Sequence, residues 1–397
     1  MADGDETREF ETAHEALATA IAAESGEAVE LARWMARHPE LSLGERETSR
    51  RYQACLGSRG FEVEAGLAGM ETAFCASWGH GSDFSAALLA EMDALPEIGH
   101  ACGHNLSGPA SLLAAAALVR VLDPAAGRLV VVGCPAEETG LGKRRLVEGG
   151  VFEGIDVAMM AHASDMRRAH RLFLGNQKFD LVFHGRASHA AAYPERGVNA
   201  LDAVVQLMSS VGLMRQQLPR GVRIHGIITD GGQAANIIPE RTAAEIWIRA
   251  LDEGELESAV ERVLACAQGA AEATGTRLEA TSLESSSPAM WPNLPLAVCY
   301  GRQLERLGLP ETGHAPDQNI GSSDITHVSH ALPTIHPNFP IGRSLQLHTR
   351  EFAAATTTPA GEAGLVEAAS ALAGTVQDLF QQPALRAEVR RAHTRAA

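Results

Sequence analysis

Hydrophobic and polar positions follow two kinds of pattern over the first 175 residues. Short runs typical of strands lie over 61–65, 72–78, 85–92, 128–133 and 157–161, and the apolar runs at 85–92 and 128–133 predict strands that are buried on both faces. Helical spacing of apolar residues predicts helices over 8–36 (with a break at Glu24-Ser25-Gly26), 110–122 and 142–149, and a helix that follows an N-cap candidate at Ser42 and ends near Leu56. This alternation predicts a mostly parallel sheet with helices on both faces.

The pattern changes after about residue 176. Strand and helix patterns then follow one another over 178–184, 198–214, 223–229, 242–250, 253–273 and 277–283. Their order, βαββαβ, is that of a ferredoxin-like unit. A linker-like stretch at 284–288 follows, and the remaining residues return to the earlier pattern. We therefore expect an α/β domain built from 1–175 and 289–397, interrupted by an α+β domain over 176–288.

Composition and charge exclude several classes of protein. The chain has 397 residues, 45% of them hydrophobic, and its 33 basic and 49 acidic residues give a net charge of −16. That balance does not favour a nucleic-acid partner, which needs clustered cations. No window reaches the roughly 18 consecutive apolar residues of a membrane span, and the acidic N-terminus lacks the features of a secretory signal. Six cysteines are too few for a disulfide framework, so we expect a cytoplasmic protein with reduced thiols.

The first candidate site residues follow the strand predicted at 85–92. Cys102 and His104 stand two residues apart around a glycine, so a tight turn can direct both at one point. Thiolate and imidazole are good ligands for zinc and related metals. The alternative is a buried thiol beside a hydrogen-bonded histidine, and the triplet alone does not decide between the two.

Two adjacent carboxylates, Glu137 and Glu138, follow the strand predicted at 128–133. Paired carboxylates at a buried strand end are costly unless a cation or a proton compensates them. Their side chains diverge, so one can bind a metal while the other faces a water molecule. The alternative is an acidic helix N-terminus, which the helix dipole favours.

Two histidines complete the set: His162 ends the strand predicted at 157–161, and His348 lies far downstream after another strand-like stretch. A single histidine at such a position is usually a hydrogen-bonded core residue. Here, however, Cys102, Glu138 and both histidines lie at or beyond strand ends, where parallel sheets bind ligands. Their conjunction predicts a metal centre.

The sequence resembles the M20 metallopeptidases and amidohydrolases, in particular their subfamily D, which includes aminobenzoyl-glutamate hydrolases and the peptidase M20 domain-containing protein 2 group. The resemblance spans about 90 to 352 and rests on MDALPEIGHACGHN, CPAEETGLGKRRLVEGGVF, FHGRASHAAAYPERGVNALDAV, ITDGGQAANIIPERTAAEIWIRA, SSDITHVSHALPTIHPNF and LHTREFA. The EIGHACGHN segment is most similar to dipeptidase-like members. Residues 1–175 and 289–397 would form the metal-binding catalytic domain, and 176–288 the lid and dimerisation domain.

The resemblance also implies a role for each matched residue. A centre of two divalent ions (Zn, Mn, Co or Ni) would be held by Cys102, His104, Glu138, His162 and His348. Glu137 matches the general base and acid, and His189 matches a histidine that reaches across a dimer to the reacting carbonyl. Asn236 and Arg249 match positions that grip the substrate carboxylate, although a strand-surface salt bridge is an alternative for Arg249. Asp93 matches the acidic residue of the first motif, behind the ligands.

The expected activity is hydrolysis of the amide bond of an N-acyl amino acid or dipeptide-like substrate by a homodimer that is joined through the inserted domain. A water activated by the metals would attack the carbonyl, and Glu137 would carry its proton to the leaving amine. The chain departs from the family pattern at Thr326-His327, where many relatives have Gly and Asn. The resemblance places His327 near the substrate pocket, so the substrate preference of the relatives cannot be carried over to this chain.

Two other functions stay open at this point. The chain could be an inactive M20-like module used for binding or dimerisation, although the intact Glu137 and the full set of ligands argue against this. It could also be an unrelated α/β enzyme with a single structural metal, in which the glutamate pair is idle. Metal content together with hydrolysis separates the three hypotheses.

Overall fold

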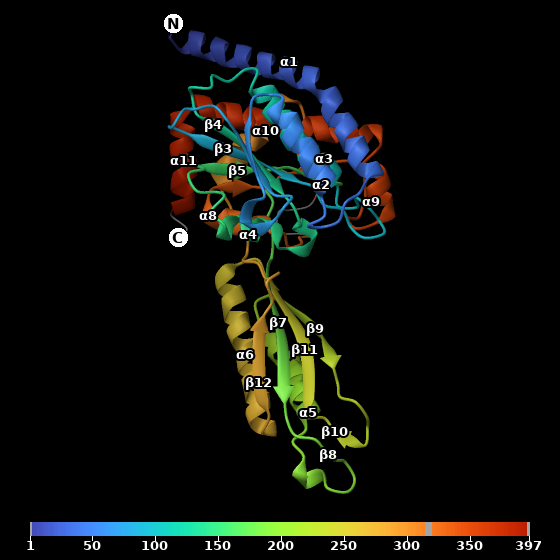
Figure 1. The fold of residues 1–397 in the computed structure, drawn as a ribbon. Helices are drawn as coiled ribbons and strands as arrows, with labels where there is room; N and C mark the ends of the chain where they lie inside the picture. Colours follow the sequence, from blue (N-terminus) through green and yellow to red (C-terminus); the bar gives the residue numbers. More distant parts are fainter. Residues whose placement is uncertain (1, 314–319, 395–397) are drawn as a thin grey trace. The chain divides into compact units, whose positions relative to one another are not determined.

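The computed structural model of the chain describes residues 2–313 and 320–394, with the side chains of residues 2–10 left aside. These residues form two compact units (Figure 1). Of the described residues, the first unit comprises 2–172, 291–313 and 327–394, and the second comprises 173–290 and 320–326. Residues 320–326 thus belong with the second unit, although they lie in the segment expected for the catalytic domain.

A six-stranded sheet is the centre of the first unit. Its order is β1-β2-β4-β3-β5-β13, from β1 (Glu62–Ala65), β2 (Phe74–Trp78), β4 (Arg128–Cys134), β3 (Ser85–Glu91), β5 (Val157–Met159) and β13 (Thr334–Ile335). The pairs β1–β2 and β2–β4 are antiparallel, and the other three are parallel. The predicted mixed, mostly parallel sheet is confirmed, and β3 is buried along its whole length, as its apolar sequence predicts.

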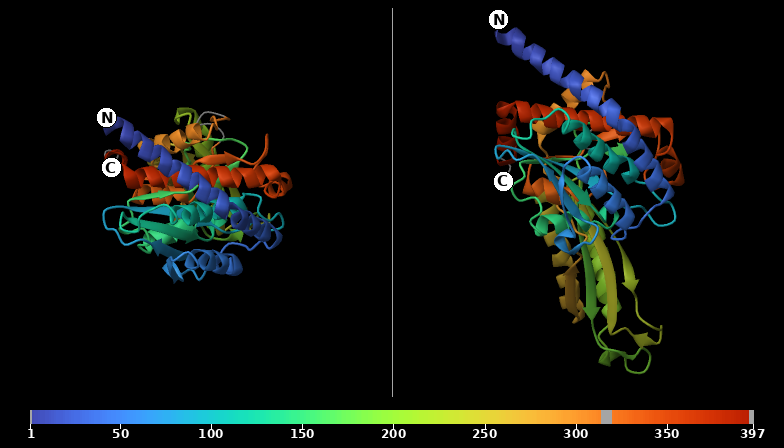
Figure 2. Two further views of the ribbon diagram at one scale, coloured as in Figure 1. Left: turned by 90° about the horizontal axis from the view of Figure 1, so that it is seen from above. Right: turned by 45° about the horizontal axis from the view of Figure 1, so that its top comes forward.

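Helices cover this sheet on both faces. The helices of the first unit are α1 (Ala2–Arg37), α2 (Arg46–Gly57), α3 (His104–Leu118), α4 (Gly142–Glu148), α7 (Leu294–Arg306), α9 (Arg350–Ala355), α10 (Pro359–Gln381) and α11 (Pro383–Thr394), while α8 (Ile325–Ala331) runs across the boundary between the units. The helix α3 packs against α1, α10 and β3 (Figure 2). Two further short strands, β6 (His162–Ser164) and β14 (Asn338–Pro340), form a separate parallel pair.

The crossovers around β3 and β4 define where a ligand can bind. The connection through α3 joins β3 to its neighbour β4, whereas the connection through α4 runs back from β4 past β3 to β5. Because crossovers between parallel strands are right-handed, two crossovers in opposite directions put their helices on opposite faces of the sheet. The loops after β3 and β4 therefore diverge, and this is the position where open α/β sheets form a ligand crevice.

The second unit has the predicted βαββαβ arrangement. Its strands are β7 (Gly175–His184), β9 (Arg223–Asp230), β11 (Arg241–Ala250) and β12 (Arg277–Ser282), and they form an antiparallel sheet in the order β12-β7-β11-β9. The helices α5 (Ala200–Met214) and α6 (Glu253–Thr274) pack on β7 and β11. A small ribbon pairs β8 (Ser188–His189) with β10 (Ile237–Ile238).

Three local expectations about helices are wrong. The helix α1 continues through Gly26, because packing of its apolar residues on α3 and α10 outweighs the roughly 1 kcal/mol that one glycine costs. The helix α3 begins at His104, six residues before its alanine-rich part. Ser42 does not cap α2, which begins at Arg46 after Glu45. The hydroxyl of Ser42 instead donates to Asp93 Oδ2 over 2.7 Å.

Two further features concern membrane spans and the cysteines. Within the part of the chain that the structure describes, no helix is long and apolar enough to cross a membrane. All six cysteines are free thiols.

Candidate active site

Polar side chains gather at the carboxyl ends of β3 and β4. Glu91 ends β3 and Asp93 follows it, while Glu137 and Glu138 lie in a 3-10 turn just after β4. Both loops lie at the divergence of the α3 and α4 crossovers. The candidate ligands of the first unit come from these loops and from the neighbouring strand ends, so the fold itself brings them to one edge of the sheet.

A glycine turn places Cys102 beside His104. Gly103 has φ = +88°, in the left-handed region, and a Cβ added there would lie 2.5 Å from Ala163 Cβ. Only glycine fits this conformation and this close approach. The turn ends directly in α3, so His104 is the first residue of a rigid, fully buried helix.

Hydrogen bonds orient two imidazoles in the same way. His104 Nδ1 donates to Asp93 O over 2.9 Å, and His162 Nδ1 donates to Ala163 O over 2.8 Å. A carbonyl oxygen can only accept, so each neutral ring carries its proton on Nδ1 and exposes a lone pair on Nε2. His162 Nε2 lies 3.5 Å from Cys102 Sγ. This arrangement is typical of metal-binding histidines.

Two buried carboxylates fix the turn that carries the glutamate pair. Ala136 has φ = +59°, a strained value for a residue with a side chain, and its N–H donates to Glu45 Oε1 over 2.9 Å. The next two amides, of Glu137 and Glu138, donate to Asp93 Oδ1 and Oδ2 over 3.2 and 3.0 Å. Three consecutive amides are thus held by side chains from distant parts of the chain.

His348 reaches the same region from the C-terminal segment. Its backbone N–H donates to Ala101 O over 2.9 Å, which ties it to the loop that carries Cys102. Its φ of +61° is again left-handed. His348 Nε2 lies 3.5 Å from Glu138 Oε2, although the side chain of His348 is 55% exposed.

The five predicted metal ligands come together in overlapping groups whose ligand atoms lie within 4.8 Å of one another. Cys102 forms one group with His104 and His162, and another with Glu138 and His348. A further group joins His104 to both glutamates. Cys102 is therefore shared by two three-donor groups, which is the arrangement that two neighbouring ions need.

The donor atoms fit divalent cations. His104 Nε2 and Glu138 Oε1 are buried and have no hydrogen-bond partner among the described residues. Buried polar atoms without partners are costly, and a metal ion would satisfy both. A thiolate, imidazoles and a carboxylate are ligands that zinc and the neighbouring first-row ions accept.

Burial sets the protonation of these groups. It raises the pKa of the Cys102 thiol well above its ordinary value, and it lowers the pKa of His162 to about 4. Burial also acts to raise the pKa of Asp93, but hydrogen bonds from His104 and Ser42 and the nearby imidazole lower it below its ordinary value. His162 is thus neutral and Asp93 ionised near pH 7, and a bound cation would displace the thiol proton of Cys102.

A buried ion pair that the sequence patterns did not indicate stands behind His104. Lys143 Nζ lies 2.6 Å from Glu91 Oε1, and both side chains are fully buried. Glu91 Oε2 lies 3.3 Å from His104 Nε2. Burial alone would raise the pKa of Glu91, but Lys143 and the neighbouring histidines lower it. The position of Glu91, a single glutamate at the end of an apolar strand, is a sequence signal that could have indicated this buried ion pair.

Two more buried groups line the site without having been predicted. His336 stacks on His162, with ring centroids 5.3 Å apart. Glu45 accepts hydrogen bonds from the amides of Leu43 and Ala136 and from the hydroxyl of Thr72. Burial raises the pKa of Glu45, and the nearby charge of Asp93 adds to the shift. Neither residue belongs to a sequence pattern that would single it out.

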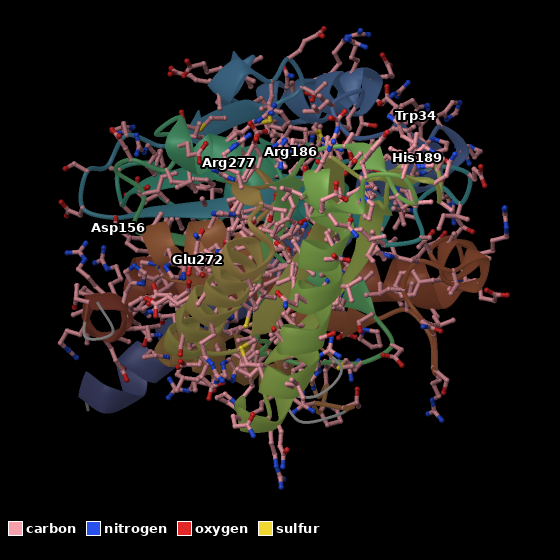
Figure 3. All side chains as sticks on the ribbon, turned by 90° about the horizontal axis from the view of Figure 1, so that it is seen from below. Trp34, Asp156, Arg186, His189, Glu272 and Arg277 are labelled. Atoms are coloured by element: carbon pink, nitrogen blue, oxygen red, sulfur yellow. The ribbon has the colours of Figure 1, made fainter. Side chains whose placement is uncertain are left out.

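The second unit carries His189 in the β8–β10 ribbon, which lies at one end of this unit (Figure 1); His189 itself is labelled in Figure 3. His189 is exposed, and its Nδ1 accepts from the amides of Ala191 and Ala192 over 3.3 and 3.1 Å. Backbone amides can only donate, so the proton of the neutral ring is on Nε2. Asn236 is next to it, since its carbonyl accepts from the amide of Ala190 over 3.1 Å.

The structure separates Asn236 from Arg249 within one chain. Arg249 pairs with Asn176 and Arg223 near the far end of β11, eight residues beyond Arg241 at its start. At about 3.3 Å per residue, this places Arg249 roughly 26 Å further along the strand. One copy of the second unit cannot bring both side chains to the same carboxylate.

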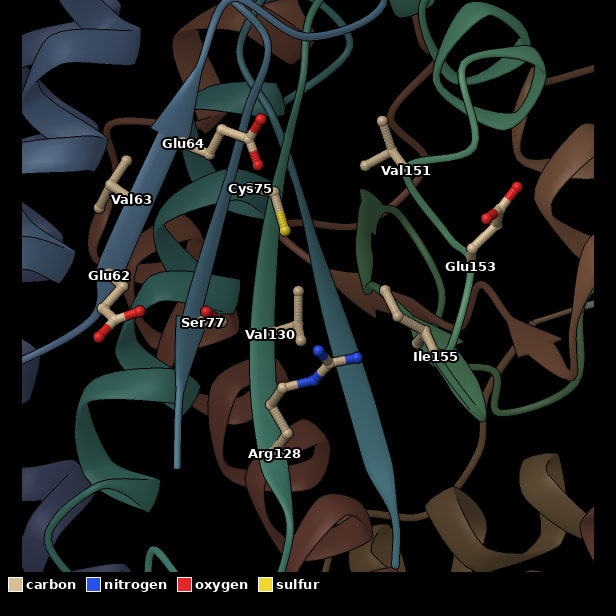
Figure 4. A pocket seen from close by; sticks show the side chains of 10 residues that line it. All are labelled: Glu62, Val63, Glu64, Cys75, Ser77, Arg128, Val130, Val151, Glu153 and Ile155. Atoms are coloured by element: carbon tan, nitrogen blue, oxygen red, sulfur yellow. The ribbon is translucent and has the colours of Figure 1, made fainter. Parts of the chain in front are cut away.

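His327 lies half-buried on α8 and belongs to none of the donor groups found among the described residues. A hollow of about 360 Å³ elsewhere in the first unit is not part of this site either. It lies over β1, β2 and β4, and its lining, which includes Glu62, Cys75 and Arg128, contains none of the predicted residues (Figure 4).

Comparison with known proteins gives two kinds of match. Residues 174–274 match the family model described as a peptidase dimerisation domain. The chain is similar to the Xaa-Arg dipeptidase of Mus musculus, with 37% identity over 81% of this chain and 78% of the relative. It is also similar to one of the chains of the p-aminobenzoyl-glutamate hydrolase of Escherichia coli, with 28% identity over 90% of this chain and 89% of the relative.

Among solved structures, the fold is similar to that of a dinuclear metal-binding peptidase of the M20 family from Bacillus subtilis. The TM-score is 0.73 at 20% identity, and the match covers 90% of this chain and 99% of that one. At this level of identity the likeness concerns the fold, including both units.

The buried pair behind His104 yields a stability prediction. Lys143→Met leaves Glu91 as a buried charge without its ammonium partner, so the free energy of unfolding should fall by about 3–5 kcal/mol in urea titrations. Arg144→Met removes the cation of the next residue, whose side chain is 30% exposed and pairs with Glu148, and should cost less than ~1 kcal/mol. The double variant Glu91→Gln/Lys143→Met should recover most of the loss. Equal effects of the two single variants would contradict this assignment.

The shared thiol yields a prediction for metal binding. Because Cys102 belongs to two donor groups, Cys102→Ser should weaken binding of Zn²⁺ or Co²⁺ at both, by more than about tenfold in chelator competition. The charge-transfer absorption between sulfur and Co²⁺ should disappear with it. Cys134→Ser is the matched control, since Cys134 is also buried but belongs to no donor group of the described residues. Unchanged affinity in Cys102→Ser would remove the thiol from the site.

Proposed function

The chain belongs to the M20 peptidase family, and on this premise we propose that it is a metal-dependent amidohydrolase or dipeptidase acting on an N-acyl amino acid or dipeptide-like substrate. The relatives support this substrate class. One is named for Xaa-Arg dipeptides and the other for p-aminobenzoyl-glutamate, and both compounds are amides whose amine part is an amino acid.

The observation that carries the proposal is the sharing of Cys102 between two three-donor groups beside Glu137. Cys102, His104 and His162 would hold one divalent ion, and Cys102, Glu138 and His348 the other. Two such ions, when bound, lower the pKa of a water molecule and polarise an amide carbonyl. The ligand set is compatible with Zn, Mn, Co or Ni.

Glu137 is the proton carrier in this proposal. Its side chain is 12% exposed, and Oε2 lies 3.8 Å from His104 Nε2. Asp93 and Glu45 fix its backbone, so the carboxylate stays next to the donor groups while Glu138 takes the role of ligand. Glu137 would accept the proton of the attacking water and return it to the leaving amine. Asp93 also orients His104, which supports its expected role behind the ligands.

His189 would act as an oxyanion donor from the second unit. Its Nε2–H is free to donate because Nδ1 already accepts two amides. A donor aimed at the developing oxyanion is typically worth about 2.7–4 kcal/mol. Asn236 would lie beside it at the substrate. The dimerisation-domain match supports a homodimer, in which His189 and Asn236 would serve the site of the partner subunit.

Arg249 would bind a substrate carboxylate with its planar, forked guanidinium. Its separation from Asn236 along β11 supports an arrangement in which the two residues reach a given site from different subunits. His327 would contribute to the substrate pocket of this chain, where many relatives have a neutral Asn. An inactive module remains the alternative, and the complete set of donors with Glu137 disfavours it.

The proposed mechanism predicts opposite outcomes for the two adjacent glutamates. Glu137→Gln should lower kcat by about 10²- to 10⁴-fold and leave metal content unchanged, because only proton transfer is lost. Glu138→Gln should lower metal content. The measurements are amine release from N-acyl amino acids and dipeptides by enzyme loaded with Mn, Zn, Co or Ni, and metal analysis of the same samples. The reverse pattern would exchange the two roles, and a fully loaded wild-type protein without activity would favour the inactive module.

Mixed dimers test whether His189 acts in trans. His189→Ala and Glu137→Gln chains should each be nearly inactive alone. Equal mixing makes half of the dimers hybrid, with one complete site each, so about a quarter of wild-type activity should return. Subunits should be exchanged under mild denaturation, with each variant treated alone as the control. Activity that does not rise on mixing would place His189 in the site of its own chain.

A further inference from the structure

One face of the second unit's sheet is not covered by its helices. Along β11, Ala244, Ile246 and Ile248 are buried against α5 and α6, so the alternate side chains Glu245, Trp247 and Arg249 point to the other face. These three side chains are half-buried. Lys178 lies directly opposite Trp247 on β7, and Asn176 lies opposite Arg249.

Trp247 is the centre of a cationic cluster on this face. Lys178 Nζ lies 4.4 Å and Arg249 Cζ 5.3 Å from the centroid of its ring. His225, opposite Trp247 on β9, lies 5.8 Å from the same ring. Cation–π attraction to the Trp247 ring helps to stabilise the two cations beside each other, although no anion lies between them.

No carboxylate of the described residues forms an ion pair with either cation. Lys178 Nζ donates to the neutral hydroxyl of Ser285 over 3.0 Å. Glu245, which shares this face with Asp180 opposite it on β7, accepts from Trp247 Nε1 over 2.6 Å. Burial and the neighbouring guanidinium lower the pKa of Lys178, while Glu245 acts in the opposite direction. Among the described residues, both cations are therefore left without a carboxylate in direct contact, and the guanidinium acts on Lys178 more strongly than Glu245 does.

The end of the cluster at Arg249 has two unsatisfied groups side by side. Arg249 Nε is buried and has no acceptor among the described residues. Asn176, directly opposite, is 4% exposed, and its Oδ1 has no donor within the same part of the chain. Buried groups of this kind are costly unless a ligand satisfies them. A carbon that carries both a carboxylate and an amide N–H, as in any N-acylated amino acid, offers the matching acceptor and donor.

We propose that this cluster, which comprises Asn176, Lys178, Trp247 and Arg249, binds the amino-acid part of the substrate and selects an acidic side chain. Arg249 and Asn176 take the α-carboxylate and the amide N–H, and Lys178 takes a second carboxylate on the side chain. The assignment rests on the proposed amidohydrolase function and narrows its substrate class to N-acylated glutamate or aspartate.

Charge and shape both favour an acidic side chain. A lysine or arginine side chain beside Lys178 and Arg249 would meet like charge, which acts against it. The Trp247 ring offers an apolar surface for the one or two methylene groups that separate the two carboxylates of aspartate or glutamate. Lys178, with a flexible stem and a compact charge, can follow either length.

The test compares N-acetyl-L-glutamate with its neutral isostere N-acetyl-L-glutamine and with Nα-acetyl-L-lysine. Wild-type enzyme should hydrolyse the glutamate compound with the lowest KM. Lys178→Ala should raise that KM by about tenfold and change the KM for the glutamine compound less than twofold, with kcat nearly unchanged. Lys178→Arg should retain most of the preference. Arg277→Ala, which removes an exposed cation of the same unit, is the control for net charge (Figure 3).

Calorimetric binding to the Glu137→Gln protein separates this proposal from the reaction itself. One outcome is that the glutamate compound binds tightly, that Lys178→Ala weakens this binding, and that wild-type enzyme does not hydrolyse the compound. This outcome would overturn the proposed reaction and support this site. Hydrolysis with equal effects of Lys178→Ala on all three compounds, or a preference for the lysine compound, would overturn the site and leave the reaction. No binding of the glutamate compound to any variant would also overturn the site.

Discussion

The compensation of buried negative charge at the carboxyl ends of β3 and β4 determines the arrangement of the whole catalytic region. Glu91, Asp93 and Glu45 are all buried there, which is tolerable only because each has specific partners. Lys143 neutralises Glu91, and the amides of the turn after β4 satisfy Asp93 and Glu45. The same bonds that stabilise these carboxylates hold Ala136 in a strained conformation and fix the direction of Glu137 and Glu138. The donor groups around Cys102 lie beside these carboxylates, and bound cations would supply the partners that their buried donor atoms lack.

In the proposed function, chemistry and recognition would be distributed over two units with different construction. The donor groups belong to the first unit and lie on loops at one edge of a mostly parallel sheet, where rigid strands and α3 fix them. The second unit would contribute side chains from both ends of an antiparallel sheet, since His189 and Asn236 lie at one end and Arg249 lies near the other. A substrate bound by residues from such distant positions fits a dimer, because two copies can supply opposite ends of the sheet. The cluster around Trp247 then adds the selection of a side chain to the recognition of the carboxylate.

Sequence and structure agree most closely where the information is local. Strand patterns predicted the strands of the two larger sheets, and the motif around Cys102 and His104 named residues that the fold brings together. The errors are equally instructive. Ser42 looked like a helix cap, but its hydroxyl serves Asp93, and Glu24-Ser25-Gly26 looked like a break, but packing on α3 and α10 keeps α1 continuous. In both cases a tertiary contact outweighed a local preference.

The sequence by itself determined the main strands and helices of residues 1–283, the order of the two domains, the family resemblance and the identity of the candidate ligands, because periodicity and short motifs are properties of neighbouring residues. Only the tertiary structure decided that Lys143 pairs with Glu91, that Glu45 holds the turn of the glutamate pair, that Asn236 and Arg249 lie apart, and that Lys178 faces Trp247. Each of these depends on strand register or on the approach of residues far apart in the chain. A shift of one residue in register would turn Lys178 to the helix side of the sheet, and no local pattern records that choice.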